Sequence, residues 1–127
     1  MASHNDLGKK GEDLAAGFME AKGYIILDRN YRFERAEIDL VALRFEPAEL
    51  VFIEVKTRSN TKDSYPEESI DTKKKKRLFK VADSYIYEKK MNTVPTRFDI
   101  ISIAMDNPDH PMIYHIEDAF RLDGPFL

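Results

Sequence analysis

The sequence predicts a mixed α/β fold, in which a sheet of about five strands is flanked by helices. Two segments carry apolar residues at helical spacing, and five short apolar runs have the length of strands. Turn residues separate these runs, in the order helix, three strands, helix, two strands. The 127 residues suit a single domain, 1–127, with one real core.

The first helix is expected over residues 6–22, because apolar and small residues recur there at helical spacing and Gly23 can end it. Gly8 and Gly11 each cost about 1 kcal/mol against alanine in a helix interior. A close approach of another backbone is therefore expected at these glycines. Strands follow at 24–33 and 36–43, joined by a short turn.

The third strand is expected at 50–58, after a tight connection that contains Pro47. Its first half is apolar on both faces, which indicates a central strand. A polar loop over 59–69 leads to the second helix at 71–90. Strands at 97–105 and 112–116 flank the turn "DNPDHP", and "EDAF" is expected to form a short helical piece.

The composition excludes several classes of protein. There is no cysteine, so disulfides, thiolate metal sites and cysteine nucleophiles are excluded. No apolar stretch approaches the roughly 20 residues of a membrane span, and the start of the chain lacks the apolar core of a signal peptide. We therefore expect a cytoplasmic protein with no membrane partner. A net charge of −3 argues against coating nucleic acid by bulk charge, but it permits local binding.

Charged residues interrupt the most hydrophobic part of the sequence, "AEIDLVALRFEPAELVFIEVKTRSN". Residues two apart in a strand share a face and lie about 6.6 Å apart, so Glu54 and Lys56 should project together. Asp39 lies in the preceding strand, which the short connection makes a neighbour. An ion pair of Lys56 with either acid would explain the charges. A divalent cation such as Mg²⁺ or Mn²⁺ would neutralise the excess of carboxylates and is the favoured explanation.

The D…E-x-K spacing resembles the signature of the PD-(D/E)XK nucleases, the restriction-endonuclease-like superfamily. The segments "GKKGEDLAAGFMEAKGYIILDRNYR", "AEIDLVA", "LVFIEVKTR", "YPEESI" and "RFDIISI…IYHIEDAF" together resemble the YraN-like family of small bacterial proteins. The resemblance covers about residues 5–120. It implies a restriction-endonuclease-like αβββαβ core and a possible nuclease chemistry.

The resemblance also implies site residues. Glu12 matches the helix glutamate of the "GE" motif, Asp39 the aspartate of "EIDL", and Glu54 and Lys56 the "EVK". Asp39 and Glu54, with the Val55 carbonyl and Glu12 as further ligands, would hold a metal ion that polarises a phosphate and lowers the pKa of a water. Lys56 would orient or help deprotonate that water.

Several neighbouring positions keep a second interpretation. Without the resemblance, Glu12 is a solvated helix glutamate, and Glu37 is expected to be a salt-bridge partner rather than a ligand. Many family members have glycine at Ala36, and Ile38 replaces the proline of a literal "PD"; neither change removes a catalytic atom. Asp99 is expected to pair with Arg97 or to cap a sheet end.

Basic residues form the candidate nucleic-acid surface, through contacts to backbone phosphates. The candidates are Arg32, Arg35, Arg58, Lys73, Lys75 and Lys76. A solvated helix face is the alternative for the lysine run. Lys74 or Lys75 could supply an extra polar group near the metal. Tyr31 and Phe33 are expected in the strand core, with base stacking as the alternative.

The leading hypothesis is a metal-dependent nuclease that acts on DNA, including branched or processed intermediates. The alternative is a nucleic-acid-binding or assembly module that keeps the fold but has little or no catalytic activity. A structural interaction domain is a third interpretation. The net acidity leaves room for a homodimer or a protein partner in each case.

Overall fold

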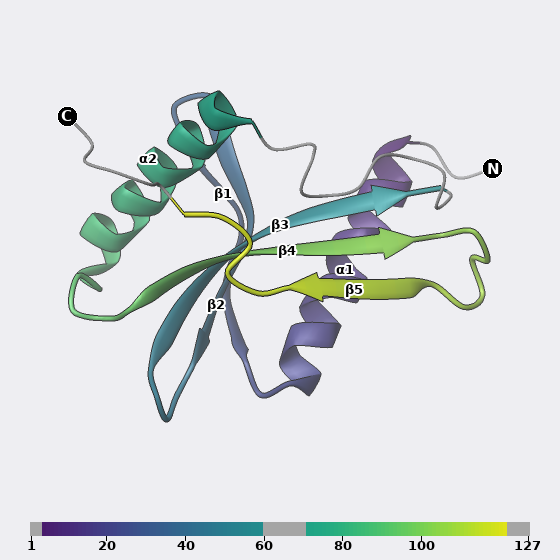
Figure 1. Ribbon diagram of the computed structural model, residues 1–127, viewed down its shortest axis with the longest axis horizontal. Coiled ribbons are helices and arrows are strands. Elements are labelled where there is room, and N and C mark those ends of the chain that lie inside the picture. Colours follow the sequence, from purple (N-terminus) through teal and green to yellow (C-terminus); the bar gives the residue numbers. More distant parts are fainter. Residues whose placement is uncertain (1–3, 60–70, 122–127) are drawn as a thin grey trace.

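The computed structural model describes residues 4–59 and 71–121, which form a five-stranded mixed sheet with one helix on each face (Figure 1). The predicted order of elements is confirmed. In chain order they are α1 (His4–Ala21), β1 (Ile25–Phe33), β2 (Ala36–Arg44), β3 (Glu49–Arg58), α2 (Thr72–Lys89), β4 (Thr96–Ala104) and β5 (Met112–Ile116).

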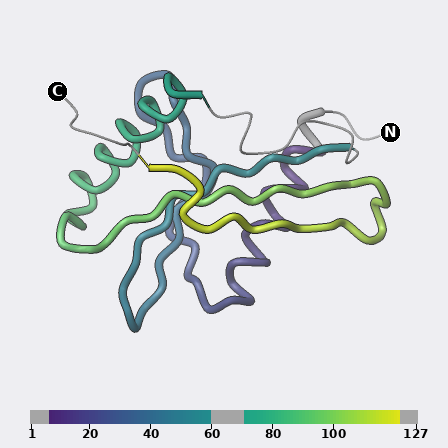
Figure 2. Tube along the Cα trace, in the orientation of Figure 1, coloured from purple at the N-terminus to yellow at the C-terminus, as the bar shows by residue number. Residues whose placement is uncertain are grey.

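The spatial order of the strands follows the chain, β1-β2-β3-β4-β5. Strands β1, β2 and β3 form an antiparallel meander, β3 and β4 are parallel, and β5 returns antiparallel to β4. A parallel pair needs a crossover connection, and α2 lies within it. The sheet twists strongly, so that β1 and β2 run across the direction of the other three strands (Figure 2).

Each helix covers its own hydrophobic core. On the α1 face, Ala15 and Met19 pack with Ile53 and Ile101 of the central strands. On the α2 face, a second cluster contains Phe52 of β3 and the helix residues Leu78, Val81, Ala82 and Tyr85. Burial of each large apolar side chain contributes about 1.5–3 kcal/mol, and β3 contributes to both cores, as its two apolar faces predict.

The boundaries of α2 follow from its caps. Asp71 accepts a hydrogen bond from the backbone N–H of Lys74 at 2.8 Å, which satisfies one of the free donors of the first turn. Lys90 adopts a left-handed conformation and closes the C-terminus with bonds to Ile86 and Tyr87. The helix predicted over 71–90 is therefore confirmed to within one residue at each end.

One predicted element is wrong. The segment "EDAF" forms a turn and irregular backbone instead of a helical piece. Asp118 has a left-handed φ of 52°, and its N–H donates to the Asp99 carboxylate, so the chain turns at this point. The loop expected over 59–69 lies outside the described residues except for Ser59.

The Asp99 carboxylate is fully buried and is compensated by several donors. It accepts two hydrogen bonds from Arg97, both at 2.8 Å, which confirms the predicted pairing. His115 Nε2 lies 2.6 Å from it, and Lys22 Nζ lies 2.8 Å from the other ring nitrogen. A proton on Nε2 satisfies both contacts, since Nδ1 then accepts from Lys22. His115 therefore has a structural role.

Neither helix in the described part of the chain is long and apolar enough to span a bilayer.

Candidate functional site

The site forms where β2 and β3 separate. Their ladder pairs residues as far as Leu40 with Ile53 and stops at Asp39. Beyond that point the Val55 N–H donates to Asp39 Oδ2 at 2.7 Å, in place of a backbone carbonyl. The N–H and C=O of one strand residue point to the same side, so the Val55 carbonyl also faces the gap. This opening gives the predicted ligands room at the sheet.

Strand β2 changes its alternation at the same place. Ile38 and Val41 both pack in the core beneath α2, whereas Leu40 packs in the core beneath α1. Residues 38 and 40 would share a face in a regular strand. The irregularity lies around Asp39 and carries its side chain into the gap between the strands.

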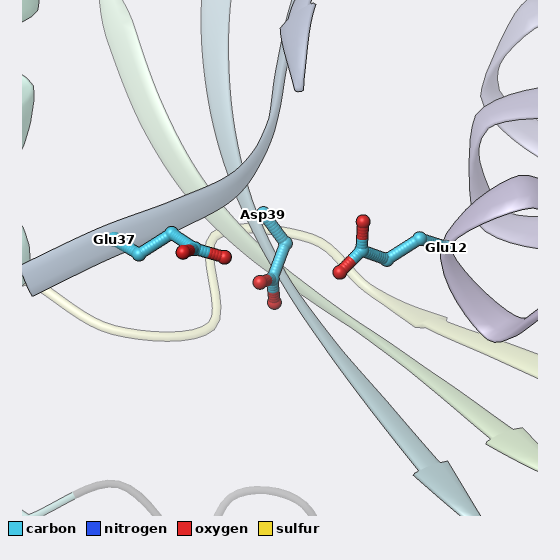
Figure 3. Close-up of side chains that lie close together, drawn as sticks. All are labelled: Glu12, Glu37 and Asp39. Carbon is cyan, nitrogen blue, oxygen red and sulfur yellow. The ribbon is translucent and has the colours of Figure 1, made fainter. Parts of the chain in front are cut away.

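Three carboxylates converge at this gap. Figure 3 shows Glu12 of α1 and Glu37 of β2 pointing toward Asp39 from opposite sides. One oxygen atom from each of the three lies within 4.8 Å of the others. The group contains only hard oxygen donors, which are the ligands that Mg²⁺ and Mn²⁺ prefer. The donor set therefore fits the predicted cation.

Gly11 explains how Glu12 reaches the strands. A Cβ at position 11 would lie 1.8 Å from Oγ1 of Thr57, so α1 can approach β3 only because this residue has no side chain. A close approach does occur at Gly11, but it is to the Thr57 side chain and not to the backbone that was predicted. At Gly8 the prediction is wrong, since no atom of the described residues outside the helix's own backbone and the two chain neighbours lies within 4 Å of such a Cβ.

Asn30 links the two outer carboxylates. It lies between Arg29 and Tyr31 of β1, which pair with Leu40 and Ile38, so it is beside Asp39. Its side-chain amide donates to Glu12 at 3.1 and 3.2 Å and to Glu37 at 2.9 Å. Its left-handed φ of 53° is a conformation that asparagine tolerates better than most residues. Asn30 thus positions both acids without neutralising them.

The electrostatics of Asp39 are unusual. Burial, together with the nearby Glu54, Glu12 and Glu37 carboxylates, raises the pKa of Asp39 to about 7, although the Val55 N–H acts in the opposite sense. Among the described residues, no cation forms an ion pair with it. A partly buried acid surrounded by other acids gains most from an added cation.

Glu54 lies beside this cluster and binds two lysines. Its Oε1 is 3.2 Å from Lys74 Nζ and 3.7 Å from Lys56 Nζ, and its side chain is 12% exposed. Burial and the neighbouring Lys74 lower the pKa of Lys56. Lys74 itself is partly buried, yet its contacts with Lys56 and Glu54 raise its pKa. The pair is therefore polarised, with Lys56 the easier amine to deprotonate.

A cavity of about 240 Å³ adjoins these groups. It is lined by Leu7, Gly8, Glu12, Val55, Lys56 and Thr57. The cavity therefore borders the Glu12 position of α1 and the segment of β3 from Val55 to Thr57. This space lies on the α1 side of β3, next to the Glu12 member of the acidic cluster.

The structure thus brings Glu12, Asp39 and Val55 together as the sequence predicts and keeps Glu54 at their edge. Glu37 accepts an ion pair from Arg32 at 2.8 Å, as expected, and it also joins the acidic cluster. The amino-acid sequence gives no signal that Glu37 belongs to this cluster. The contacts of Asn30 with Glu12 and Glu37 were not predicted either. The signal available in the sequence was a polar residue within a strand pattern.

The predicted basic residues have diverse environments. Arg32 is paired with Glu37, and Arg58 donates to Ser102 at 2.9 Å. Lys75 lies 6.0 Å from the Phe120 ring, whereas Lys73 and Lys76 are exposed on α2. Arg35 lines a separate groove beside α2.

The aromatic pair of β1 divides between core and surface. Tyr31 packs against the core beneath α2, as predicted. The prediction is wrong for Phe33, which is 38% exposed at the end of β1 and belongs to neither core cluster.

Fold and site together define a small mixed α/β protein with an acidic cluster and a lysine pair at the gap between two central strands. The chain belongs to the uncharacterised protein family UPF0102, whose model matches residues 11–103. This supports the family level of the assignment made from the sequence.

Similar proteins span nearly the whole chain. A UPF0102 protein of Bacteroides thetaiotaomicron is 46% identical over 120 residues, which cover 94% of this chain and 96% of the relative. A UPF0102 protein of Christiangramia forsetii is 42% identical, with 94% and 98% covered. One from Persephonella marina is 41% identical, with 91% and 94% covered.

Proposed function

We propose that this protein is a metal-dependent nuclease that hydrolyses phosphodiester bonds of DNA, with a restriction-endonuclease-like core. The observation that carries the proposal is the cluster of Glu12, Glu37 and Asp39 beside the Glu54–Lys56–Lys74 group. Carboxylates that can hold a cation, next to an amine with a lowered pKa, are groups that can promote phosphodiester hydrolysis.

The roles of the residues follow from their positions. Glu12 and Asp39, with the Val55 carbonyl, are the proposed ligands of Mg²⁺ or Mn²⁺, and Glu37 is a further carboxylate within reach. When bound, the cation would stabilise negative charge on the phosphate and acidify a water molecule. Glu54 holds both lysines in place.

Lys56 is the proposed base. Its amine accepts a proton from the water as the water oxygen attacks phosphorus and the bond from phosphorus to the leaving oxygen breaks. The leaving oxygen takes a proton from solvent, so the products are a hydroxyl and a phosphate monoester. Lys74, which keeps its positive charge beside Lys56, offsets charge that develops on the phosphoryl oxygens.

Cleavage of a labelled panel tests this proposal: linear duplex, single strand, flap, four-way junction and RNA, each with Mg²⁺ and with Mn²⁺. Wild type is compared with Asp39→Asn and Lys56→Ala. Asparagine keeps an oxygen that accepts from the Val55 N–H, so the fold is preserved better than with alanine. Asp13→Asn, on the same helix as Glu12 but paired with Arg29 at 2.6 Å, is the matched control.

We expect cleavage by wild type and by the control, and its loss in the other two variants. Equal cleavage by wild type and Asp39→Asn contradicts the proposal.

The alternative function is a nucleic-acid-binding or assembly module without hydrolysis. It is favoured by the ion pairs that offset the charge of two of the acids, since Glu54 binds two lysines and Glu37 binds Arg32. These two carboxylates need no metal ion to neutralise them. Binding of a fork or junction probe without cleavage of any probe would support it.

A further inference from the structure

A second concave region lies on the α2 side of the sheet, outside the acidic cluster. It is a groove of about 480 Å³ between the β1–β2 turn and the helix. It is lined by Phe33, Glu34, Arg35, Ala36, Arg77 and Lys80. This volume is within the range of small-molecule and nucleotide sites in proteins.

The groove is basic, and its cations are available. Arg35, Arg77 and Lys80 converge on it from two elements, against the single carboxylate of Glu34. No ion pair joins any of the three cations to a carboxylate in the described part of the chain, in contrast to Arg32, which is bound to Glu37. Cations that face a common space without partners create a positive potential suited to a phosphate backbone.

Phe33 adds a second kind of recognition. Its side chain is 38% exposed, lines the groove and makes no ring contact with another aromatic residue within 4–59 and 71–121. An exposed ring beside guanidinium groups is the combination with which proteins hold unpaired bases and their phosphates. Bases of a duplex are stacked on each other and cannot use such a ring.

The groove lies near the proposed catalytic residues along both of the elements that line it. Ala36 precedes Asp39 by three residues along β2, a distance of about 10 Å. On α2, Arg77 follows Lys74 by one helical turn, about 5 Å along the axis. A strand whose phosphate lies at the acidic cluster can therefore extend between the hairpin turn and α2.

We propose that this groove binds a single-stranded segment of nucleic acid, with phosphates at Arg35, Arg77 and Lys80 and a base stacked on Phe33. This inference rests on the proposed nuclease function and specifies its substrate: a nucleic acid that is unpaired beside the bond to be cleaved.

Fluorescence anisotropy of a labelled thymidine oligonucleotide tests the groove, in EDTA so that binding is measured without cleavage. The same oligonucleotide paired with its complement serves as the duplex probe. The variants are Phe33→Ala and Arg77→Ala. The matched control is Lys10→Ala, which removes one exposed charge on the side of α1 away from Glu12.

We expect both groove variants to weaken single-strand binding by about fivefold or more and to change duplex binding less. The slope of log affinity against log salt should become shallower by about 0.7 in Arg77→Ala and stay unchanged in Phe33→Ala. An abasic oligomer should bind equally to wild type and Phe33→Ala, since it has no base to stack. The Lys10→Ala control should bind like wild type.

Single-strand affinity at the wild-type level in both groove variants would overturn the inference. So would an equal loss for the duplex. Cleavage by wild type in Mg²⁺ or Mn²⁺ is measured separately. If wild type does not cleave, but the groove variants bind the single strand more weakly than wild type, the nuclease proposal fails and the groove proposal stands. If both groove variants cleave every single-stranded probe as well as wild type does, the groove proposal fails and the nuclease proposal stands.

Discussion

Gly11 and Thr57 lie closer than any residue with a side chain would allow, since a Cβ on Gly11 would be 1.8 Å from Thr57 Oγ1. Gly11→Ala should therefore push α1 away from β3 and lower the free energy of unfolding by about 1–3 kcal/mol. The displacement also moves Glu12, so cation binding should weaken. Urea denaturation and a Mn²⁺ titration measure the two effects.

Gly8→Ala is the matched control for this change. Because the described residues leave the space around the added Cβ open beyond the helix backbone itself, the substitution should leave the fold intact and stabilise it by up to about 1 kcal/mol. Thr57→Ala should partly rescue Gly11→Ala, since it removes the nearest atom. Equal stability of the two glycine variants would refute the steric explanation.

The raised pKa of Asp39 predicts a pH-dependent stability in the absence of divalent cations. Its folded pKa, about 7, lies above its ordinary value of 3.8, so the folded state binds more protons between these values. The free energy of unfolding should then fall as the pH rises from about 4 to about 7, by an amount on the order of 3 kcal/mol. Denaturant melts across this range should show a smaller fall in Asp39→Asn than in Asp13→Asn.

Cation binding should discriminate between the two sets of candidate ligands. A cation that binds only the folded state raises the free energy of unfolding by about 2.7 kcal/mol at a concentration of one hundred times Kd, and the melting temperature rises with it. Wild type and Asp13→Asn should show this Mn²⁺ effect, and Glu12→Gln and Asp39→Asn should lose most of it. The geometry predicts a larger loss in Glu37→Gln than in Glu54→Gln.

The reverse ranking of these last two variants would favour the ligand set that the sequence motif implies.

The lysine pair predicts a shift in the pH dependence of cleavage. If Lys56 accepts the proton, the rate should rise with pH through its lowered pKa. Lys74→Met removes the neighbouring ammonium, so the pKa of Lys56 should rise and the ascending limb should move to higher pH. Lys73→Met, exposed on the same helix, should leave the profile unchanged. An unshifted limb in Lys74→Met would exclude this coupling.

The buried Asp99 predicts sensitivity to acid. Burial alone would raise its pKa, but the bonds from His115 and Arg97 outweigh burial and lower it. The stability that Asp99 contributes is therefore complete above its ordinary pKa and is lost as the pH falls through its lowered one. Asp99→Asn removes one of the two carboxylates that pair with the buried Arg97 and leaves Glu49 as the other, so the change should cost about 1.5–3 kcal/mol at neutral pH. An acid titration of wild type and a urea titration of Asp99→Asn, each followed by circular dichroism, measure the acid sensitivity and the loss of stability.

Much of the fold could be predicted because local patterns and long-range packing agree. Leu78, Val81, Ala82 and Tyr85 recur at helical spacing in the sequence and form the buried face of α2, and Asp71 caps the helix. The segment "EDAF" misled the prediction, because its short apolar pattern gives way to the bond between the Asp118 N–H and Asp99. Nothing local in the sequence reports a partner 19 residues away.

The site was only partly predictable for a related reason. The spacing of Glu54 and Lys56 in one strand places them on one face, and a short connection makes Asp39 their neighbour. The roles of Glu37 and Asn30 depend on an irregular β2 and on a left-handed residue within β1. Likewise, the exposure of Phe33 follows from its place at the end of β1, which hydrophobicity alone does not reveal.

The hydrogen bond from the Val55 N–H to Asp39 gives position 39 a structural role in addition to its proposed catalytic one. Because a carboxylate of β2 accepts there in place of a backbone carbonyl, a relative without the proposed hydrolysis would still need an oxygen acceptor at position 39. Aspartate or asparagine should persist in such lineages after Lys56 has drifted, so retention of an acid at this position is a poor marker of a working enzyme.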